Sequence, residues 1–212
     1  VTTDRISKAL AQFVRSIVSV NSKYDQGSRR VNSPLDDFPN FSRQENRGKE
    51  LFMEKNPPGS TITCVGCHMS ESFVSPIQFS PTATTSTQNI GLDRRSTDDF
   101  GVMETTGNPE DDGKFKAPSL RNIGVSVPYM HDGRFRNLRD VVEFYSRDIE
   151  PHPNLSALLQ NERGNPVRFD FSRDEEDDLV AFLNTLTDRH VLMDKKFSDP
   201  FRRERNDRRN ER

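Results

Sequence analysis

The chain has 212 residues, of which 31% are hydrophobic and 30% are charged, and its formal net charge is -2. This length suffices for one medium-sized domain and an appendage, although the content of hydrophobic residues is low for a core of that size. The near-neutral charge gives no indication of a nucleic-acid or anionic-membrane partner. No apolar stretch reaches the ~20 residues that a membrane span needs. The N-terminus has neither a basic leader nor an apolar signal core, so we expect a removed signal or a longer parent chain.

The first fifth of the chain predicts one helix and a connector. Residues 4–19 predict an amphipathic helix, because their apolar side chains recur at steps of three and four. The members of this apolar stripe are Ile6, Leu10, Phe13 and Ile17. Residues 20–41 are polar and contain two prolines, which indicates an extended connector.

Two capping boxes predict the helices that frame the rest of the chain. The residues Ser42 to Glu45 open a helix that runs to about position 55, and Ser172 to Glu175 open the final helix. Gly48 lies inside the first of these helices, where glycine costs about 1 kcal/mol relative to alanine. We therefore expect another helix to cross Gly48 at close range.

The middle of the chain is irregular. Residues 69–116 are rich in Ser, Thr, Asn, Asp, Gly and Pro and show no sustained period. A structureless run of that length is unusual in a compact domain unless it wraps a cofactor or carries an interface. Asn137 then caps a predicted helix over roughly 138–147. No segment alternates over the length of a strand, so the predicted fold class is mostly α.

Cys64, Cys67 and His68 form a Cys-x-x-Cys-His motif, the attachment pattern of c-type heme. The two thiols form thioethers with the porphyrin, and the adjacent histidine is placed under the iron as its proximal ligand. Buried porphyrin would also supplement the thin apolar core. A zinc site would need two further ligands, and the chain has no other cysteine and no paired histidines. A thioredoxin-like pair would need a βαβ context, which is missing. The motif therefore predicts one covalent heme c.

Residues 115–147 contain the segments FKAPSLRNI and PYMHDGRF and then the helix with Tyr145. They resemble the C-terminal heme domain of bacterial diheme cytochrome c peroxidases, and above all their MauG-type relatives. Residues 5–25 are similar to the segment that leads out of the family's N-terminal heme domain, and 195–201 resemble its closing motif. The resemblance implies a mostly α, cytochrome c-type heme domain with an N-terminal linking helix. The implied division is a linking helix and connector over 1–41, the heme domain over 42–190 and a frayed C-terminal tail over 191–212.

The sequence departs from the family in one respect, because the family has two attachment motifs per chain and this sequence has one. The N-terminal half of the family holds the peroxide-binding heme, its acid–base glutamate and a tryptophan between the hemes, and this chain has no tryptophan. The resemblance therefore implies the electron-transfer half of a peroxidase-type oxidoreductase. It would accept electrons from a small redox protein and pass them to a peroxide-reducing heme on another domain or subunit. The alternative is a monoheme electron carrier, or a cytochrome subunit of a larger complex, without peroxidase activity.

The resemblance also implies residues around the iron. Tyr145 falls on the position of the distal iron ligand in MauG-type relatives. Met130 is the alternative, since thioether sulfur is a common ligand of c-type heme, and Met103 is a weaker one. An open or water-bound iron is the remaining option. No catalytic residue is assigned, but His131 lies in the signature His-Asp-Gly and is the candidate for a supporting position beside the heme.

Three further residues are candidates for binding. Arg121 is suited to a heme propionate, because a guanidinium matches a carboxylate. The family's calcium lies between its domains and is held partly by backbone carbonyls, which match Ser126 and Pro128 here. A c-type heme and the family together imply a periplasmic or otherwise extracytoplasmic location.

Overall fold

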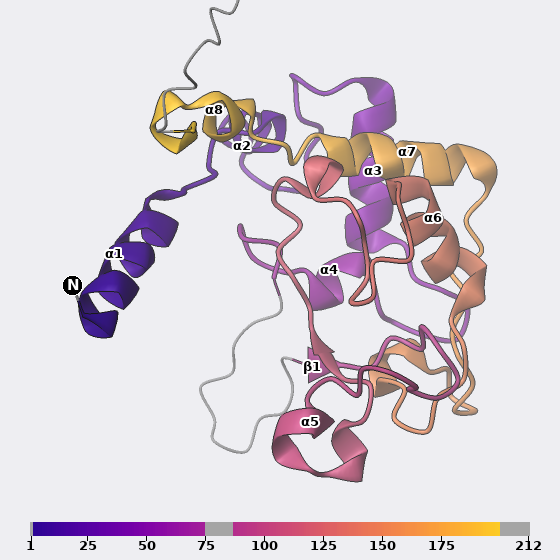
Figure 1. Cartoon of the computed structure of the whole chain (residues 1–212). Helices are drawn as coiled ribbons and strands as arrows, with labels where there is room; N and C mark the ends of the chain where they lie inside the picture. The colour runs from indigo at the N-terminus through magenta and orange to yellow at the C-terminus, as the bar shows by residue number, and fades with distance from the viewer. Residues whose placement is uncertain (1, 75–86, 200–212) are drawn as a thin grey trace, which may run out of the picture.

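Two helices, α3 (Arg43–Glu54) and α7 (Arg173–Asn184), cross at the centre of the computed structural model (Figure 1). Gly48 lies at the crossing. A Cβ atom at this position would overlap the backbone carbonyl oxygen of Asp178 and would lie 2.9 Å from the Cβ of Phe182. The close helix crossing predicted at Gly48 is therefore confirmed.

The structure describes residues 2–74 and 87–199. Its other α-helices are α1 (Thr3–Ser16), α2 (Lys23–Ser28), α4 (Cys64–Cys67), α5 (Met103–Thr106), α6 (Leu138–Glu143) and α8 (Arg189–Met193). A π-helical turn over Phe144–Asp148 continues α6, and 3-10 turns lie at Pro109–Asp111, Ile123–Val125, Ala157–Leu159 and Lys195–Phe197. Two short antiparallel strands, β1 (Thr87–Gln88) and β2 (Phe115–Lys116), pair with Gln88 opposite Phe115. The mostly α class is confirmed in the coarse sense that the described chain is rich in helix and has little strand.

The connector predicted as extended over 20–41 contains a helix, α2, which is a correction. Ser22 caps α2, and its side chain accepts from the amide of Asp25 while the Asp25 carboxylate accepts from the amide of Ser22. The aromatic ring of Tyr24 on the same helix is buried against Phe73, with 4.9 Å between ring centroids. The capping box and this aromatic contact together overcome the polar composition that indicated an extended chain.

Aromatic rings form the centre of the core. Phe52 on α3 and Phe182 on α7 lie 5.2 Å apart between centroids, and Phe73 lies 6.1 Å from Phe52. Tyr24 joins the same cluster from α2. The linking segment, the two crossing helices and the loop after the Cys-x-x-Cys-His motif therefore share one apolar core.

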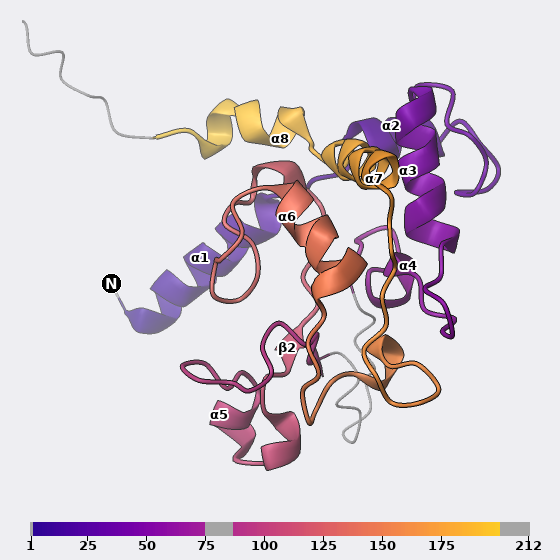
Figure 2. The same ribbon diagram turned by 90° about the vertical axis from the view of Figure 1, so that its right-hand side faces the viewer.

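α1 projects away from this core, as Figures 1 and 2 show. None of its residues is buried, and its apolar stripe is open to solvent. A contact near its end joins Phe13 to Phe197, with 6.0 Å between ring centroids. Among the described helices, none is long and apolar enough to span a membrane. Of the predicted irregular run over 69–116, positions 75–86 lie outside the described residues, as does the predicted tail from position 200 onward.

Candidate functional site

The Cys-x-x-Cys-His motif forms the single helical turn α4, and His68 ends it by donating its backbone amide to the carbonyl of Cys64. Residues three apart on a helix lie on the same side, so both thiols face one direction. Both cysteines are free and partly buried. Burial, together with the neighbouring Cys67, raises the pKa of Cys64 to about 12. The two thiols therefore stay protonated near neutral pH in the chain alone.

The imidazole of His68 is held by two backbone carbonyls. Its Nδ1 lies 3.2 Å from the carbonyl oxygen of Phe73 and 3.2 Å from that of Pro118. Since both partners can only accept, Nδ1 carries the hydrogen and Nε2 keeps its lone pair free. Burial lowers the pKa of His68, although the two hydrogen bonds oppose this effect. A neutral imidazole with a free Nε2 is the form that binds a metal.

Tyr145 lies on the π-helical turn that follows α6 and packs, partly buried, against the core. Its ring meets Phe144 at 5.0 Å between centroids and at 71°. Burial raises the pKa of the phenol, and the nearby thiols of Cys67 and Cys64 raise it further. The phenol and the two thiols therefore share one interior region. Single π-turns inside helices occur frequently at functional sites.

The other candidates for the iron lie in different settings. Met130 is partly buried against the core and has a left-handed backbone with φ of 68°. Met103 begins the short helix α5 and is partly buried. His131 is exposed, and its ring stacks on Phe115 with 4.0 Å between centroids and 11° between planes. Stacking on an aromatic ring fixes the position of His131 without any polar partner.

Arg121 is engaged by protein groups. Its guanidinium donates to both carboxylate oxygens of Asp25 at 2.9 Å and to the backbone carbonyl of Glu71 at 2.5 Å. Its predicted role at a heme propionate stays a prediction. Ser126 and Pro128, the candidates for calcium, are exposed, and the Ser126 hydroxyl donates to the carbonyl of Asn122 at 2.9 Å.

A cavity of about 170 Å³ lies beside His131 and is lined by Asp132, Arg134 and His152 among others. His152 was given no role from the sequence, yet its side chain is buried and its Nε2 has no hydrogen-bond partner. The nearest carboxylate oxygen, on Asp112, lies 3.7 Å away. A small shift of either side chain would complete this hydrogen bond.

Sequence reasoning missed the groups that hold His68 and Arg121. The carbonyls of Phe73 and Pro118 carry no signal in a sequence, because every residue has a carbonyl. Asp25 did carry a sequence signal, because Ser22 and Asp25 have the capping-box spacing that also marks the starts of α3 and α7. Applying that pattern within 20–41 would have found α2 and Asp25.

The residues present fit a covalently attached heme. Two neutral thiols lie on one helical turn, a histidine has its Nδ1 occupied and its Nε2 free, and a buried phenol shares their interior region. Within 2–74 and 87–199, no group of three or more His, Cys, Asp and Glu side chains gathers into a further metal site.

Several known proteins are similar to this chain over most of its length. No protein-family model matches the chain. The methylamine utilization protein MauG of Methylophilus methylotrophus is 30% identical over 186 residues, which cover 88% of this chain and 48% of that protein. The cytochrome c551 peroxidase of Nitrosomonas europaea is 31% identical over 190 residues, which cover 88% of this chain and 45% of that enzyme.

Two solved structures have a similar fold. A MauG-like protein associated with microbial copper homeostasis superposes with a TM-score of 0.64 and 32% identity, covering 87% of this chain and 53% of its own. The diheme peroxidase BthA from Burkholderia thailandensis shares the fold, with a TM-score of 0.57 and 24% identity, covering 82% of this chain and 48% of its own. The chain spans about half the length of the curated relatives it matches. It belongs to the family of MauG proteins and bacterial diheme cytochrome c peroxidases.

Proposed function

We propose that this chain is the electron-transfer heme domain of a diheme cytochrome c peroxidase or MauG-like oxidoreductase. It accepts electrons and passes them to a peroxide-reducing heme on a partner domain or subunit. The observation that carries the proposal is the orientation of His68, whose Nδ1 is occupied by two carbonyls while its Nε2 stays free. In this proposal Cys64 and Cys67 would hold one heme c as thioethers, and His68 and Tyr145 would bind its iron.

The heme, when bound, supplies a one-electron iron couple. The chain's own residues tune and protect that couple. Both carbonyls draw on the Nδ1 hydrogen of His68, which raises the basicity of Nε2. The phenol of Tyr145 is a hard oxygen donor that, once deprotonated on a metal, favours ferric over ferrous iron. Iron bound by both His68 and Tyr145 would be closed to peroxide, so this domain would be suited to moving electrons.

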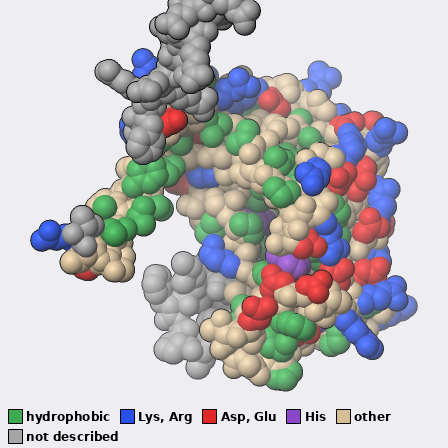
Figure 3. All heavy atoms as spheres, viewed as in Figure 1, with side chains coloured by type: hydrophobic (Ala, Val, Ile, Leu, Met, Phe, Trp, Pro, Cys, Tyr) green, Lys and Arg blue, Asp and Glu red, His purple; other side chains and the backbone are tan. Residues whose placement is uncertain are grey.

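The exposed face of α1 supports a partner domain. Its stripe of apolar residues is open to solvent, with Leu10 59% and Phe13 50% exposed (Figure 3). α7 and the residues just after it carry apolar side chains at the same spacing, and there all of these side chains are buried. The matching positions are Leu10, Phe13 and Val14 on α1 with Ile17 just after it, and Leu179, Phe182 and Leu183 on α7 with Leu186 just after it.

This repeated pattern favours a particular kind of partner. α7 buries its stripe against α3 within the heme domain. We expect α1 to bury its own stripe against a helix of a second heme domain, as an equivalent closing helix. The relatives have about twice the length of this chain, which leaves room for such a domain.

The test is peroxide-dependent oxidation of a reduced small cytochrome, measured per heme with and without the partner domain. The chain alone should exchange electrons with the reduced cytochrome yet turn over peroxide slowly, because it offers no open iron and no acid–base group beside it. Adding the partner domain should restore turnover. Fast, saturable peroxide turnover by the chain alone would contradict this division of labour and make His131 the first acid–base group to test.

Matched variants of α1 test the partner surface. Phe13→Ser on the apolar stripe should abolish restoration by the partner domain and leave electron exchange of the chain alone unchanged. Lys8→Ser lies on the opposite, polar side of the same helix and should restore turnover normally. Equal behaviour of the two variants would show that the partner does not bind this stripe.

Three further parts of the proposal follow from the heme and the family. The location is periplasmic or otherwise extracytoplasmic, and the electron donor is a small redox protein. A calcium ion between this domain and its partner would take the backbone carbonyls of Ser126 and Pro128. Both positions are exposed, so they are accessible to a partner. Calcium should then tighten the association of the two domains, and chelation should weaken it.

A further inference from the structure

Two loops meet at His68, and their contacts are unusually regular. Three consecutive residues of one loop donate to the carbonyls of the other. Ser119 donates its hydroxyl to the carbonyl of Ser72 at 2.5 Å, and Leu120 donates its amide to the carbonyl of Phe73 at 3.3 Å. Arg121 donates its guanidinium to the carbonyl of Glu71 at 2.5 Å. The spacing between the loops over 71–73 and 118–121 is therefore fixed by side chains as well as by backbone.

The distance between the two loops determines the lengths of the hydrogen bonds that the His68 imidazole makes. One of its two acceptors, the carbonyl of Phe73, belongs to the first loop, and the other, the carbonyl of Pro118, belongs to the second. A change in the distance between the loops changes both hydrogen bonds together. Hydrogen bonds to the remote nitrogen of a metal-binding histidine set its basicity and its orientation.

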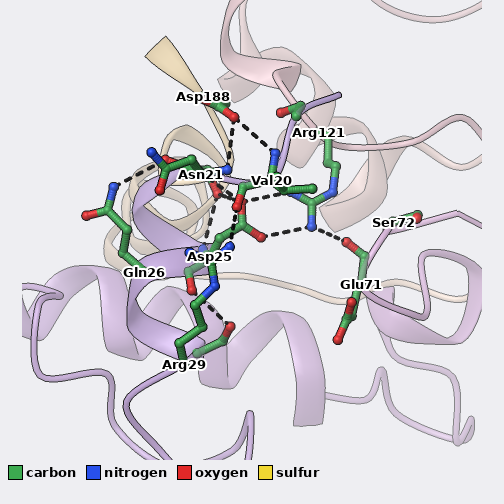
Figure 4. Close-up of polar contacts among 12 residues, drawn as sticks. Val20, Asn21, Asp25, Gln26, Arg29, Glu71, Ser72, Arg121 and Asp188 are labelled. Carbon is green, nitrogen blue, oxygen red and sulfur yellow. Dashed lines mark hydrogen bonds and ion pairs between the residues drawn. The ribbon is translucent and has the colours of Figure 1, made fainter. Parts of the chain in front are cut away.

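Arg121 is held at its far end by Asp25, 96 positions away in the chain (Figure 4). The ion pair is well shielded, with Arg121 16% and Asp25 9% exposed. Ser22 in turn donates its amide and its hydroxyl to the Asp25 carboxylate at 2.8 and 2.7 Å. A paired carboxylate with all these donors has little freedom to move, so Arg121 is fixed from the side of α2.

The same region ties down the linking segment. Asp188 accepts from the amides of Val20 and Asn21 at 3.0 and 2.9 Å. Asn122, next to Arg121, donates to the hydroxyl of Ser19 at 3.1 Å and accepts from the amide of Asp188 at 2.8 Å. Positions 19–25 are thereby linked to the loop that carries Pro118 and Arg121.

We infer that Arg121 is a positioning residue for His68 and that Asp25 fixes Arg121 in that role, so that the segment 19–25 sets the reduction potential of the heme. The inference rests on the proposed function in one respect, the binding of iron by Nε2 of His68. Asp25 and Arg121 act by holding the carbonyl of Glu71 and, through it, the loop that presents the carbonyl of Phe73. Loss of the ion pair loosens that loop, weakens the hydrogen bonds of His68 and makes its imidazole a poorer donor. The ferric state then loses stability relative to the ferrous state, and the potential rises.

The experiment measures the reduction potential of the heme-loaded full chain by optical redox titration. Asp25→Asn and Arg121→Gln should each lower the ferric-to-ferrous ratio at a given applied potential by about tenfold, which corresponds to ~59 mV for a one-electron couple. Arg121→Lys keeps the charge but cannot donate to Asp25 and Glu71 together with the same geometry. It should shift the potential in the same direction by less, and it provides a variant that folds if the others do not.

Asp111→Asn is the matched control. It breaks an ion pair with Lys114 of similar shielding, with Asp111 4% and Lys114 21% exposed, and the hydrogen-bond partners of both residues lie within 102–114, not in either loop at His68. It should cost comparable stability and leave the potential unchanged. Equal potentials in Arg121→Lys, Asp25→Asn and Asp111→Asn would overturn the inference. A wild-type chain without covalent heme would instead contradict the proposed function, so the two failures are distinguishable.

Discussion

Gly48 on α3 lies directly against the backbone carbonyl of Asp178 on α7. Helices can approach this closely only where one of them lacks a side chain, so the crossing depends on the glycine. The two helices frame the domain that contains the Cys-x-x-Cys-His turn, and α3 and α4 are themselves in contact.

We expect Gly48→Ala to lower the free energy of unfolding by a net of about 1 kcal/mol. Overpacking against a backbone atom costs about 1–3 kcal/mol and outweighs the gain of about 1 kcal/mol in helix propensity. Urea denaturation followed by circular dichroism measures the change. Glu50→Ala, on the exposed side of the same helix, should stay within about 0.5 kcal/mol of the wild type. Equal stability of the two variants would mean that the crossing is looser than described.

Asp188→Asn should weaken the attachment of residues 19–25 to the rest of the domain. The Asp188 carboxylate accepts from the amides of Val20 and Asn21 and from those at the start of α8. Hydrogen bonds to a charged acceptor contribute about 1.5–3 kcal/mol each, so the amides of Val20 and Asn21 should exchange with solvent at least tenfold faster. Hydrogen exchange read by mass spectrometry measures this. Asp194→Asn, at a partly buried cap of the following turn, should leave both amides unchanged.

Cys64→Ala combined with Cys67→Ala should convert the heme from covalent to extractable. Thioether bonds survive acidified acetone, whereas axial ligation through His68 does not. The wild-type protein should keep its colour, and its mass should exceed that of the polypeptide by one heme. The double variant should also be less stable, because buried porphyrin contributes apolar surface to the core. Colour that leaves the wild-type protein would reject the attachment of heme at these two cysteines.

Tyr145→Phe should change the spin state of the ferric heme and raise its potential, because it removes the oxygen donor proposed for the sixth position. Tyr129→Phe is the control, since Tyr129 is also buried and donates its hydroxyl to the carbonyl of Ile123 at 2.8 Å. It should cost about 1 kcal/mol of stability and leave the heme spectrum intact.

The methionine alternative has its own signature. Ligation by Met130 would give a weak near-infrared band that survives in Tyr145→Phe and disappears in Met130→Leu. That result would replace Tyr145 by Met130 as the distal ligand.

The ion pair between Asp25 and Arg121 should make stability depend on pH. Burial raises the pKa of Asp25, but hydrogen bonds from Arg121 and Ser22 outweigh burial and hold the pKa below its ordinary value. A carboxylate with a lowered pKa stabilises the fold above the unfolded value of about 3.9. This stabilisation is lost as the pH falls through the lower, folded value. The destabilisation by Asp25→Asn, about 3 kcal/mol at neutral pH, should therefore shrink below about pH 4. A constant difference across urea titrations at neutral and acidic pH would contradict this.

Local patterns predicted the helices well where a cap and a period coincide. The two capping boxes at Ser42 and Ser172 open α3 and α7 where they were expected, and Asn137 caps α6. α1 ends at Ser16, three residues before the predicted end, and none of its residues is buried. α2 was not predicted, because the polar composition and the two prolines of 20–41 indicated an extended chain.

Long-range pairing could not be read from the sequence. Arg121 was expected to be free for a propionate, and its bidentate partner Asp25 lies far away in the chain. The spacing of Cys64, Cys67 and His68 predicts which side chains meet the heme. These residues lie close together in the sequence, so their arrangement does not depend on contacts between distant parts of the chain. It does not predict which carbonyls meet the Nδ1 of His68, since any backbone group can accept.

The two acceptors at Nδ1 have a mechanical consequence. One hydrogen is shared between the carbonyls of Phe73 and Pro118 at equal distances, so neither loop alone sets the rotation of the imidazole ring. The plane of the ring follows the midpoint between the loops and averages their positions. The orientation of the His68 ring therefore depends on both loops, and the strength of its hydrogen bonds depends on the distance between them.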